Sequence, residues 1–137
     1  IAVPIDDVVT LDVDITPEEF ERAVGRTGFS RFVMVDEDGD LMGYLHLKDV
    51  MGVPLEDSHR PMPITRVRSL VNLGADVDVE KALAVMQRTG SHVARVLDGA
   101  GETIGILFFE DVLETLVGEI RDATQQQGQR RLNVSTE

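Results

Sequence analysis

The chain of 137 residues contains no cysteine and no tryptophan, and aromatic residues make up only 4% of it. Without cysteine, neither a disulfide framework nor a cysteine-based zinc site or thiol nucleophile can form. The sequence also has no apolar run near the roughly 20 residues that a membrane-spanning helix needs. Basic residues are few, because 13 Lys and Arg stand against 25 Asp and Glu and leave a net charge of −12. Such a chain repels phosphate backbones and anionic lipids, which disfavours nucleic acid and membrane surfaces as partners.

Motifs of catalysis and of metal binding are missing as well. The three histidines, His46, His59 and His92, have no zinc-site spacing, no serine lies in a GxSxG elbow, and there is no GxxxxGK[ST] phosphate loop. Residues 36–40 suggest a calcium loop, but an EF-hand needs its glycine two places later and a glutamate where Leu47 stands. We therefore predict that the chain is not an enzyme and has no dedicated metal site.

The sequence repeats itself. Residues 30–50 align with residues 91–112, and residues 16–28 align with residues 78–90. The helical segments, residues 16–28 and 78–90, align at an offset of 62. Residues 30–50 and 91–112 align at an offset of 61 before their glycine-rich turn and of 62 after it. This change predicts one extra turn residue in the second copy. We therefore expect two tandem copies of one unit, since such periodicity is the signature of repeat architectures.

Each copy has the pattern of a strand, a helix, two strands and a second helix, which makes the fold class α+β. Thr16 and Asp78 are typical helix N-caps, and Gly28 and Gly90 are typical helix stops. Strands are expected at residues 8–13, 32–35, 41–47, 64–71, 93–97 and 103–109, and helices at residues 16–28, 47–53, 78–90 and 109–123. A unit of this size is marginal alone, so we expect the two sheets to pack against each other by pseudo-two-fold symmetry. The predicted division is a first repeat at 1–55, a linker at 56–63, a second repeat at 64–123, and a polar tail at 124–137 that is disordered or begins a missing segment.

One heptapeptide recurs at the same point of both copies, where a strand ends and a helix begins. It runs from Gly43 to Asp49 in the first copy and from Gly105 to Asp111 in the second. Glycine permits the close approach of another backbone or a flat ligand, and an aspartate is favoured in a first helical turn. Either copy alone is explained by local packing, but the recurrence favours a shared binding role.

These residues resemble a family. The tandem unit, the Gly-to-Asp heptapeptide and the sequence SRFVMVD resemble a pair of cystathionine-β-synthase (CBS) domains, a Bateman module, over residues 8–122. The ending, residues 105–122, is similar to that of the hemolysin C-like, magnesium and cobalt efflux family, which is related to the cyclin M transporters. The resemblance implies two tandem CBS repeats that bind an adenosine nucleotide, AMP, ADP or ATP with or without Mg²⁺, in clefts between the repeats.

The resemblance also implies roles for particular residues. Asp49 and Asp111 are candidates to hold the ribose hydroxyls, because a carboxylate can accept hydrogen bonds from a vicinal diol. His46 replaces the family's Thr or Ser and could meet a phosphate, whereas Phe108 in the second copy cannot donate. The further binding candidates are Gly43, Gly105, the adenine-wall residues Phe32, Val33, Val93 and Ala94, and the cleft-closing residues Ile64 and Thr65. Five arginines near the proposed clefts could offset the acidic charge: Arg31, Arg66, Arg68, Arg88 and Arg95.

We therefore expect a cytoplasmic regulatory module that passes its state to a membrane ion-transport domain of the same full-length chain. A homodimer is expected through an apolar helix face made of Val112, Leu113, Leu116, Val117 and Ile120. Two alternatives stay open: a nucleotide-free dimerisation module whose pockets are filled by its own side chains, and an acidic Mg²⁺ sensor.

Overall fold

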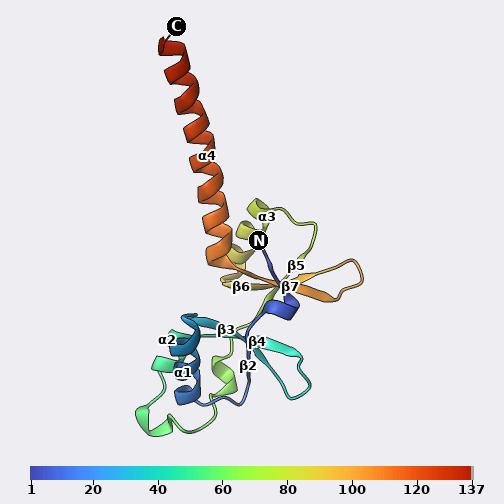
Figure 1. Ribbon diagram of the computed structural model, residues 1–137. Helices are drawn as coiled ribbons and strands as arrows, with labels where there is room; N and C mark the ends of the chain where they lie inside the picture. Colours follow the sequence, from blue (N-terminus) through green and yellow to red (C-terminus); the bar gives the residue numbers. More distant parts are fainter. Residues whose placement is uncertain (137) are drawn as a thin grey trace. The chain divides into compact units, whose positions relative to one another are not determined.

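The computed structural model describes residues 1–136, with side chains through Thr124, and divides them into two compact units (Figure 1). The first unit comprises Pro4–Val71. The second comprises Ile1–Val3 together with the chain from Asn72 onward. Among the described residues, no helix is both long and apolar enough to span a bilayer.

The first unit is a three-stranded sheet covered on one face by helices. Its strands lie in the order β2-β3-β4, with β2 parallel to β3 and β3 antiparallel to β4. Its elements are η1 (Ile5–Asp7), β2 (Thr10–Asp12), α1 (Pro17–Thr27), β3 (Arg31–Val35), β4 (Leu41–His46), α2 (Leu47–Met51), η2 (Leu55–Asp57) and η3 (Ile64–Arg66).

The second unit repeats this plan with an added edge strand. Its sheet has the order β1-β7-β6-β5, and β6 and β7 form an antiparallel hairpin. Its elements are β1 (Val3–Pro4), β5 (Val71–Gly74), α3 (Val79–Thr89), β6 (Val93–Leu97), β7 (Thr103–Phe108) and α4 (Phe109–Thr136). The expected α+β fold of two tandem repeats is confirmed.

Local sequence accounts for the helix ends in both repeats. The Thr16 hydroxyl accepts a hydrogen bond from the Glu19 backbone N–H and completes a capping box, while Asp78 accepts from the Lys81 N–H. Both helices end at a left-handed glycine, Gly28 with φ +79° and Gly90 with φ +71°.

A single offset of 62 residues relates the two repeats throughout, without the extra turn residue that the sequence alignment predicted. The first residue of α2, Leu47, donates its N–H to the Ser30 carbonyl, and the first residue of α4, Phe109, donates to the His92 carbonyl. Ser30 therefore corresponds to His92 and not to Ser91. The alignment was wrong by one residue before the turn, because Ser30 and Ser91 are identical in type but do not occupy equivalent positions.

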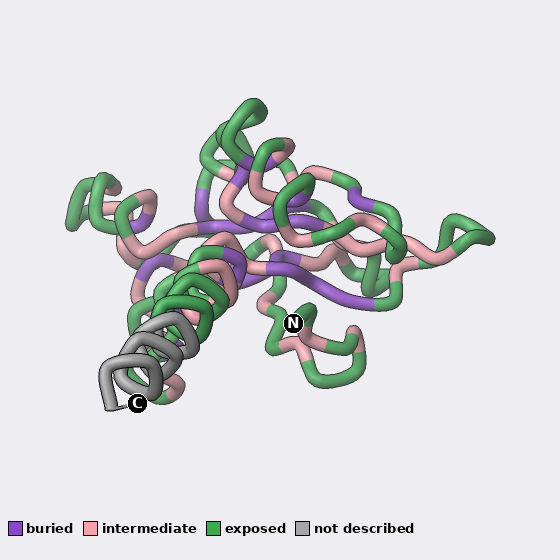
Figure 2. Tube along the Cα trace, turned by 90° about the horizontal axis from the view of Figure 1, so that it is seen from above, coloured by how far each residue is buried: buried purple, intermediate pink, exposed green. Residues whose placement is uncertain are grey.

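The core of the first unit lies between its sheet and its helices. Phe20 and Ala23 of α1 pack with Phe32, Met34 and Leu45 of the strands, and the Phe20 and Phe32 rings meet edge to face at 5.3 Å between centroids. Figure 2 shows buried segments along the strands of both units and exposed residues along the turns.

Three expectations about chain segments differ from the structure. Residues 64–71 were expected to form a strand, but Ile64–Arg66 is a 3-10 turn and β5 begins only at Val71. The expected linker contributes Met62 to the core of the first unit. The tail from Thr124 was expected to be disordered or to begin a missing segment. Since α4 continues through Thr136, over a stretch free of proline and rich in the good helix formers Gln and Arg, only the second alternative stays a prediction. Glu137 lies outside the described residues.

Candidate functional site

Asp49 is the centre of a polar cluster where β4 passes into α2. Its carboxylate accepts a hydrogen bond from the His46 backbone N–H at 3.0 Å. The Arg68 guanidinium donates to both carboxylate oxygens, with Nε 2.9 Å from Oδ2 and Nη2 2.6 Å from Oδ1. The Asp49 side chain is only 11% exposed, while that of Arg68 is 50% exposed. The carboxylate is thus held in one orientation by groups 3 and 19 residues away along the chain.

Gly43 allows the Arg68 segment to reach this position. The Tyr44 N–H donates to the Arg68 carbonyl and the Arg68 N–H donates to the Tyr44 carbonyl, both at 2.9 Å. A Cβ on Gly43, whose φ is +151°, would lie 2.3 Å from the Arg68 carbonyl oxygen. The glycine of the recurrent heptapeptide therefore serves the close approach of another backbone, one of the two uses expected of it.

The charges around Asp49 set its protonation state. Burial raises the pKa of the Asp49 carboxyl, but hydrogen bonds from Arg68 and the His46 backbone, with the Arg68 charge, outweigh burial and hold that pKa below its ordinary value of 3.8. Burial and then the Arg31 charge lower the pKa of His46 below 6.5. At neutral pH the Asp49 carboxylate is charged and the His46 ring is neutral.

The His46 ring is held in a tautomer that leaves it one hydrogen-bond donor. Its Nδ1 accepts a hydrogen bond from the Lys48 backbone N–H at 2.9 Å and caps α2. A neutral imidazole that accepts at Nδ1 carries its proton at Nε2, so His46 keeps one N–H to offer to a ligand oxygen.

Two further arginines lie close to Asp49 and concentrate positive charge on this part of an acidic chain. The Arg66 guanidinium donates to the Asp49 backbone carbonyl at 3.2 Å. Arg31, on β3, interacts electrostatically with Asp49, Tyr44 and Arg68. Three of the five arginines noted in the sequence therefore lie near Asp49: Arg31, Arg66 and Arg68. The pairing of β3 with β4 brings Arg31 here, and the turn after Pro63 brings Arg66 and Arg68.

The corresponding place in the second unit has different chemistry. A Cβ on Gly105 would lie 2.9 Å from the Val3 carbonyl oxygen, so this glycine also faces a close backbone. Within the described part of the chain, no hydrogen bond or ion pair involves the Asp111 carboxylate; only its backbone carbonyl accepts, from Thr115. At the offset of 62, Phe108 replaces His46 and Val93 replaces Arg31, so the second unit lacks both polar groups.

The remaining predicted binding residues are distributed over the core and the surface. Phe32 is a core residue whose ring contacts Phe20 and Phe29, and Ile64 and Thr65 are exposed on η3. Three are fully buried on the strands: Val33, Val93 and Ala94. With the offset of 62, the counterpart of Phe32 in the second repeat is Ala94, and the counterpart of Val33 is Arg95. The Arg95 Nε donates a hydrogen bond to the Asn72 side chain at 3.2 Å.

Sequence reasoning missed the specific partnership of Arg68 and Asp49. The two residues are far apart in the sequence, and Arg68 follows a 3-10 turn that was expected to be part of a strand. The only available signal was Gly43, which indicated a close backbone without saying which one.

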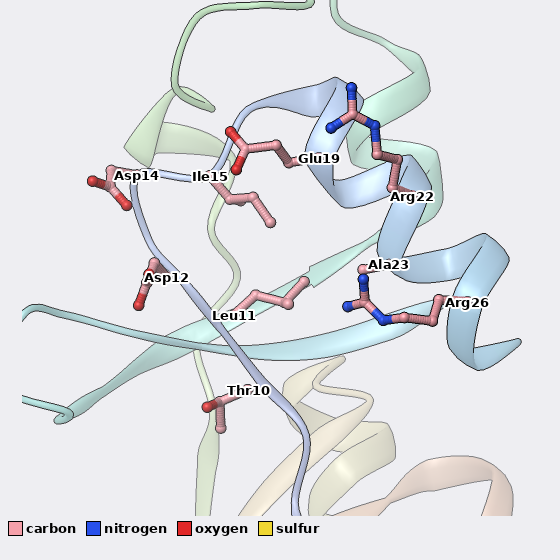
Figure 3. A pocket seen from close by; sticks show the side chains of 9 residues that line it. All are labelled: Thr10, Leu11, Asp12, Asp14, Ile15, Glu19, Arg22, Ala23 and Arg26. Atoms are coloured by element: carbon pink, nitrogen blue, oxygen red, sulfur yellow. The ribbon is translucent and has the colours of Figure 1, made fainter.

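A cavity of about 470 Å³ in the first unit lies apart from this cluster. Arg22 and Arg26 line it from α1, and Asp12 and Asp14 line it from β2 and the turn that follows (Figure 3). Arg22 is paired with Glu18 at 2.6 Å. None of the binding residues expected from the sequence lines this cavity, and its mixed charges favour no single ligand class.

Comparisons with known proteins point in one direction. The family model of the CBS domain matches residues 1–56 and 65–118. An uncharacterized protein, Rv1841c of Mycobacterium tuberculosis (strain ATCC 25618 / H37Rv), is 34% identical over 131 residues, which cover 92% of this chain and 38% of that protein. UPF0053 protein YugS of Bacillus subtilis (strain 168) is 26% identical over 132 residues, or 92% of this chain and 29% of that protein. The chain thus spans less than two fifths of the length of these relatives.

Solved structures of CBS domains have the same fold as this chain. The CBS domain of a bacterial CNNM/CorC family Mg²⁺ transporter in complex with ATP has a TM-score of 0.75 and 25% identity, covering 86% of this chain and 84% of that one. A CBS-domain pair with bound AMP from Klebsiella pneumoniae shares the fold, with a TM-score of 0.65, 22% identity and coverage of 85% and 94%.

Proposed function

Because this chain belongs to the CBS-domain family, we propose that it is a regulatory module that binds an adenosine nucleotide through Asp49. The observation that carries the proposal is the Asp49 carboxylate, which is ionised, oriented by the His46 N–H and close to three arginines. A carboxylate can accept from both hydroxyls of a ribose, and arginines are the residues best suited to phosphate.

Binding requires an exchange of partners at Asp49. Arg68 now donates to both carboxylate oxygens, so a ribose diol can take those positions only if Arg68 leaves. The half-exposed Arg68 side chain has room to turn, and a phosphate on the same ligand gives it a new anionic partner. The His46 Nε2–H is a further donor to phosphate, in keeping with its place in the recurrent heptapeptide.

Asp111 of the second unit is the weaker candidate for a ribose. Its carboxylate is open to a diol, but Phe108 and Val93 offer no donor where the first unit has His46 and Arg31. A nucleotide at this place would therefore lack the phosphate contacts that offset a net charge of −12.

The setting that we propose is a membrane ion transporter. The solved relative with ATP is a CBS domain of a Mg²⁺ transporter, and the curated relatives are much longer than this chain. In this setting the module lies on the cytoplasmic side of the membrane and biases a transport domain of the same chain. It does so by binding nucleotide more tightly in one of two conformations, since only differential affinity shifts a population.

A second candidate function is a nucleotide-free dimerisation module. It is favoured by exposed apolar residues on one face of α4, namely Leu113, Val117 and Ile120. Val112, expected on the same face, is instead buried in the core. A homodimer through this face is compatible with nucleotide binding, so only the absence of binding would favour the second function over the first.

Calorimetric titration of AMP, ADP and ATP, with and without Mg²⁺, tests the proposal. Asp49→Asn keeps the shape of the side chain but removes its charge, and we expect it to abolish binding, while Asp111→Asn leaves binding intact and serves as the matched control. Loss of binding in Asp111→Asn alone would move the site to the second unit. No heat from any nucleotide at millimolar concentration would favour the dimerisation module.

A further inference from the structure

The second unit contains an apolar cavity of about 200 Å³ between its sheet and α3. Its floor is formed by Leu73, Ala82 and Leu107, all buried. Every side chain that lines it is apolar, and the complete lining is Ile1, Ala2, Leu73, Gly74, Ala75, Val77, Val79, Ala82, Val96 and Leu107.

The first unit has larger side chains at the floor of the equivalent place, although Leu11, Asp12 and Ile15, the counterparts of Leu73, Gly74 and Val77, line its own cavity of about 470 Å³. At the offset of 62, Ala82 corresponds to Phe20, which is 0% exposed, and Val96 corresponds to Met34. The Phe20 ring packs edge to face on Phe32, whose counterpart is Ala94. Two phenyl rings and a methionine of the first core are therefore replaced by two alanines and a valine in the second. The cavity lies where this side-chain volume is missing.

The physical chemistry of the cavity selects its ligand. Of the lining residues only the floor, Leu73, Ala82 and Leu107, is buried, so the cavity opens to solvent on its other side. A polar group at the floor would find no side-chain donor or acceptor among the lining residues. A neutral ring would remove this apolar surface from water and gain dispersion contacts with it.

We propose that this cavity binds a neutral aryl group of one or two rings, which takes the place that Phe20 occupies in the first unit. The site is separate from Asp49, and the proposal does not depend on nucleotide binding. The ligand class is a small aromatic molecule, or the aryl end of a larger one, without charge on the buried part.

Titration of the chain with benzene and with indole, followed by methyl NMR, tests this proposal. We expect saturable shifts of the Leu73, Val96 and Leu107 methyls with half-saturation at about 1 mM or below, within the range for ligands of this size. The methyls of Leu45, the counterpart of Leu107 in the filled core, are expected not to shift. Absence of saturable shifts at ten times that concentration would overturn the proposal.

Variants locate the ligand in the cavity. Ala82→Phe supplies the ring that the first unit has, so we expect it to melt no lower than the wild type and to lose binding at least tenfold. Ala84→Phe adds the same ring to an exposed position of α3 and is expected to bind as the wild type does. If Ala82→Phe does not fold, Val96→Met narrows the cavity with the residue found in the first unit and is expected to weaken binding. Equal binding by the wild type and every folded cavity-filling variant would refute the assignment.

Discussion

Replacing Gly43 by alanine tests how the Asp49 cluster is assembled. The new Cβ would lie 2.3 Å from the Arg68 carbonyl oxygen and 2.7 Å from Val67 Cγ1. Because the nearest atom belongs to the backbone, the contact cannot be relieved by a side-chain rotation. The segment must move away from β4, and its two hydrogen bonds with Tyr44 must break.

The expected cost follows from these contacts. Each hydrogen bond contributes about 0.5–1.5 kcal/mol net, and an alanine held in a conformation suited to glycine adds about 1 kcal/mol or more. We therefore expect Gly43→Ala to lower the free energy of unfolding of the first unit by about 3 kcal/mol. It should also separate Arg68 from Asp49, since this pairing holds Arg68 in place.

Urea denaturation followed by circular dichroism measures the effect. Gly25→Ala is the matched control, because nothing lies within 4 Å of a Cβ at this exposed position of α1. Relief of glycine's entropy cost in a helix should stabilise that variant by about 0.5–1 kcal/mol. A Gly43→Ala protein as stable as the wild type would refute the reasoning, because Arg68 would then not be positioned by backbone pairing with β4.

Three further predictions follow from the same structure. Arg68→Gln removes the competitor for Asp49, so calorimetry should show tighter binding of adenosine but weaker binding of AMP and ATP; parallel changes for all three would contradict the exchange of partners. The lowered pKa of Asp49 implies a contribution to stability that is present above pH 3.8 and lost as pH falls through the folded-state pKa. The difference in unfolding free energy between the wild type and Asp49→Asn should therefore shrink below pH 3.8, and a difference independent of pH would exclude an ionic origin. Val117→Lys with Ile120→Lys places charge on the exposed face of α4 and should halve the mass of a dimer in sedimentation, whereas an unchanged mass would assign the contact to another surface.

The repeat plan and the helix ends were predictable because they depend on neighbours in the sequence. The capping residue Thr16 and the stop Gly28 act within one turn of their own helix, and alternating apolar residues mark the hairpin strands. The recurrent heptapeptide likewise marked Gly43 and Asp49 as candidate binding residues. Their local structure agrees with the prediction, since Gly43 admits a close backbone and Asp49 is fixed in the first turn of α2.

Other features could not be read from local pattern. The apolar stretch after Pro63 is compatible with a strand, and only the packing of the chain against β4 decides that it begins as a 3-10 turn and delivers Arg68 to Asp49. Met62 looked like part of a polar linker, yet tertiary contacts make it a core residue.

The sequence alone thus determined the family, the order of the elements and the two aspartates, because spacing and residue type at short range suffice for these. Tertiary structure alone decided which aspartate is surrounded by arginines and which repeat has a cavity lined only by apolar side chains. Both depend on contacts between residues far apart in the chain. Phe20 and Ala82 occupy the same place in equivalent helices, and only the surrounding walls show that one fills a space that the other leaves empty.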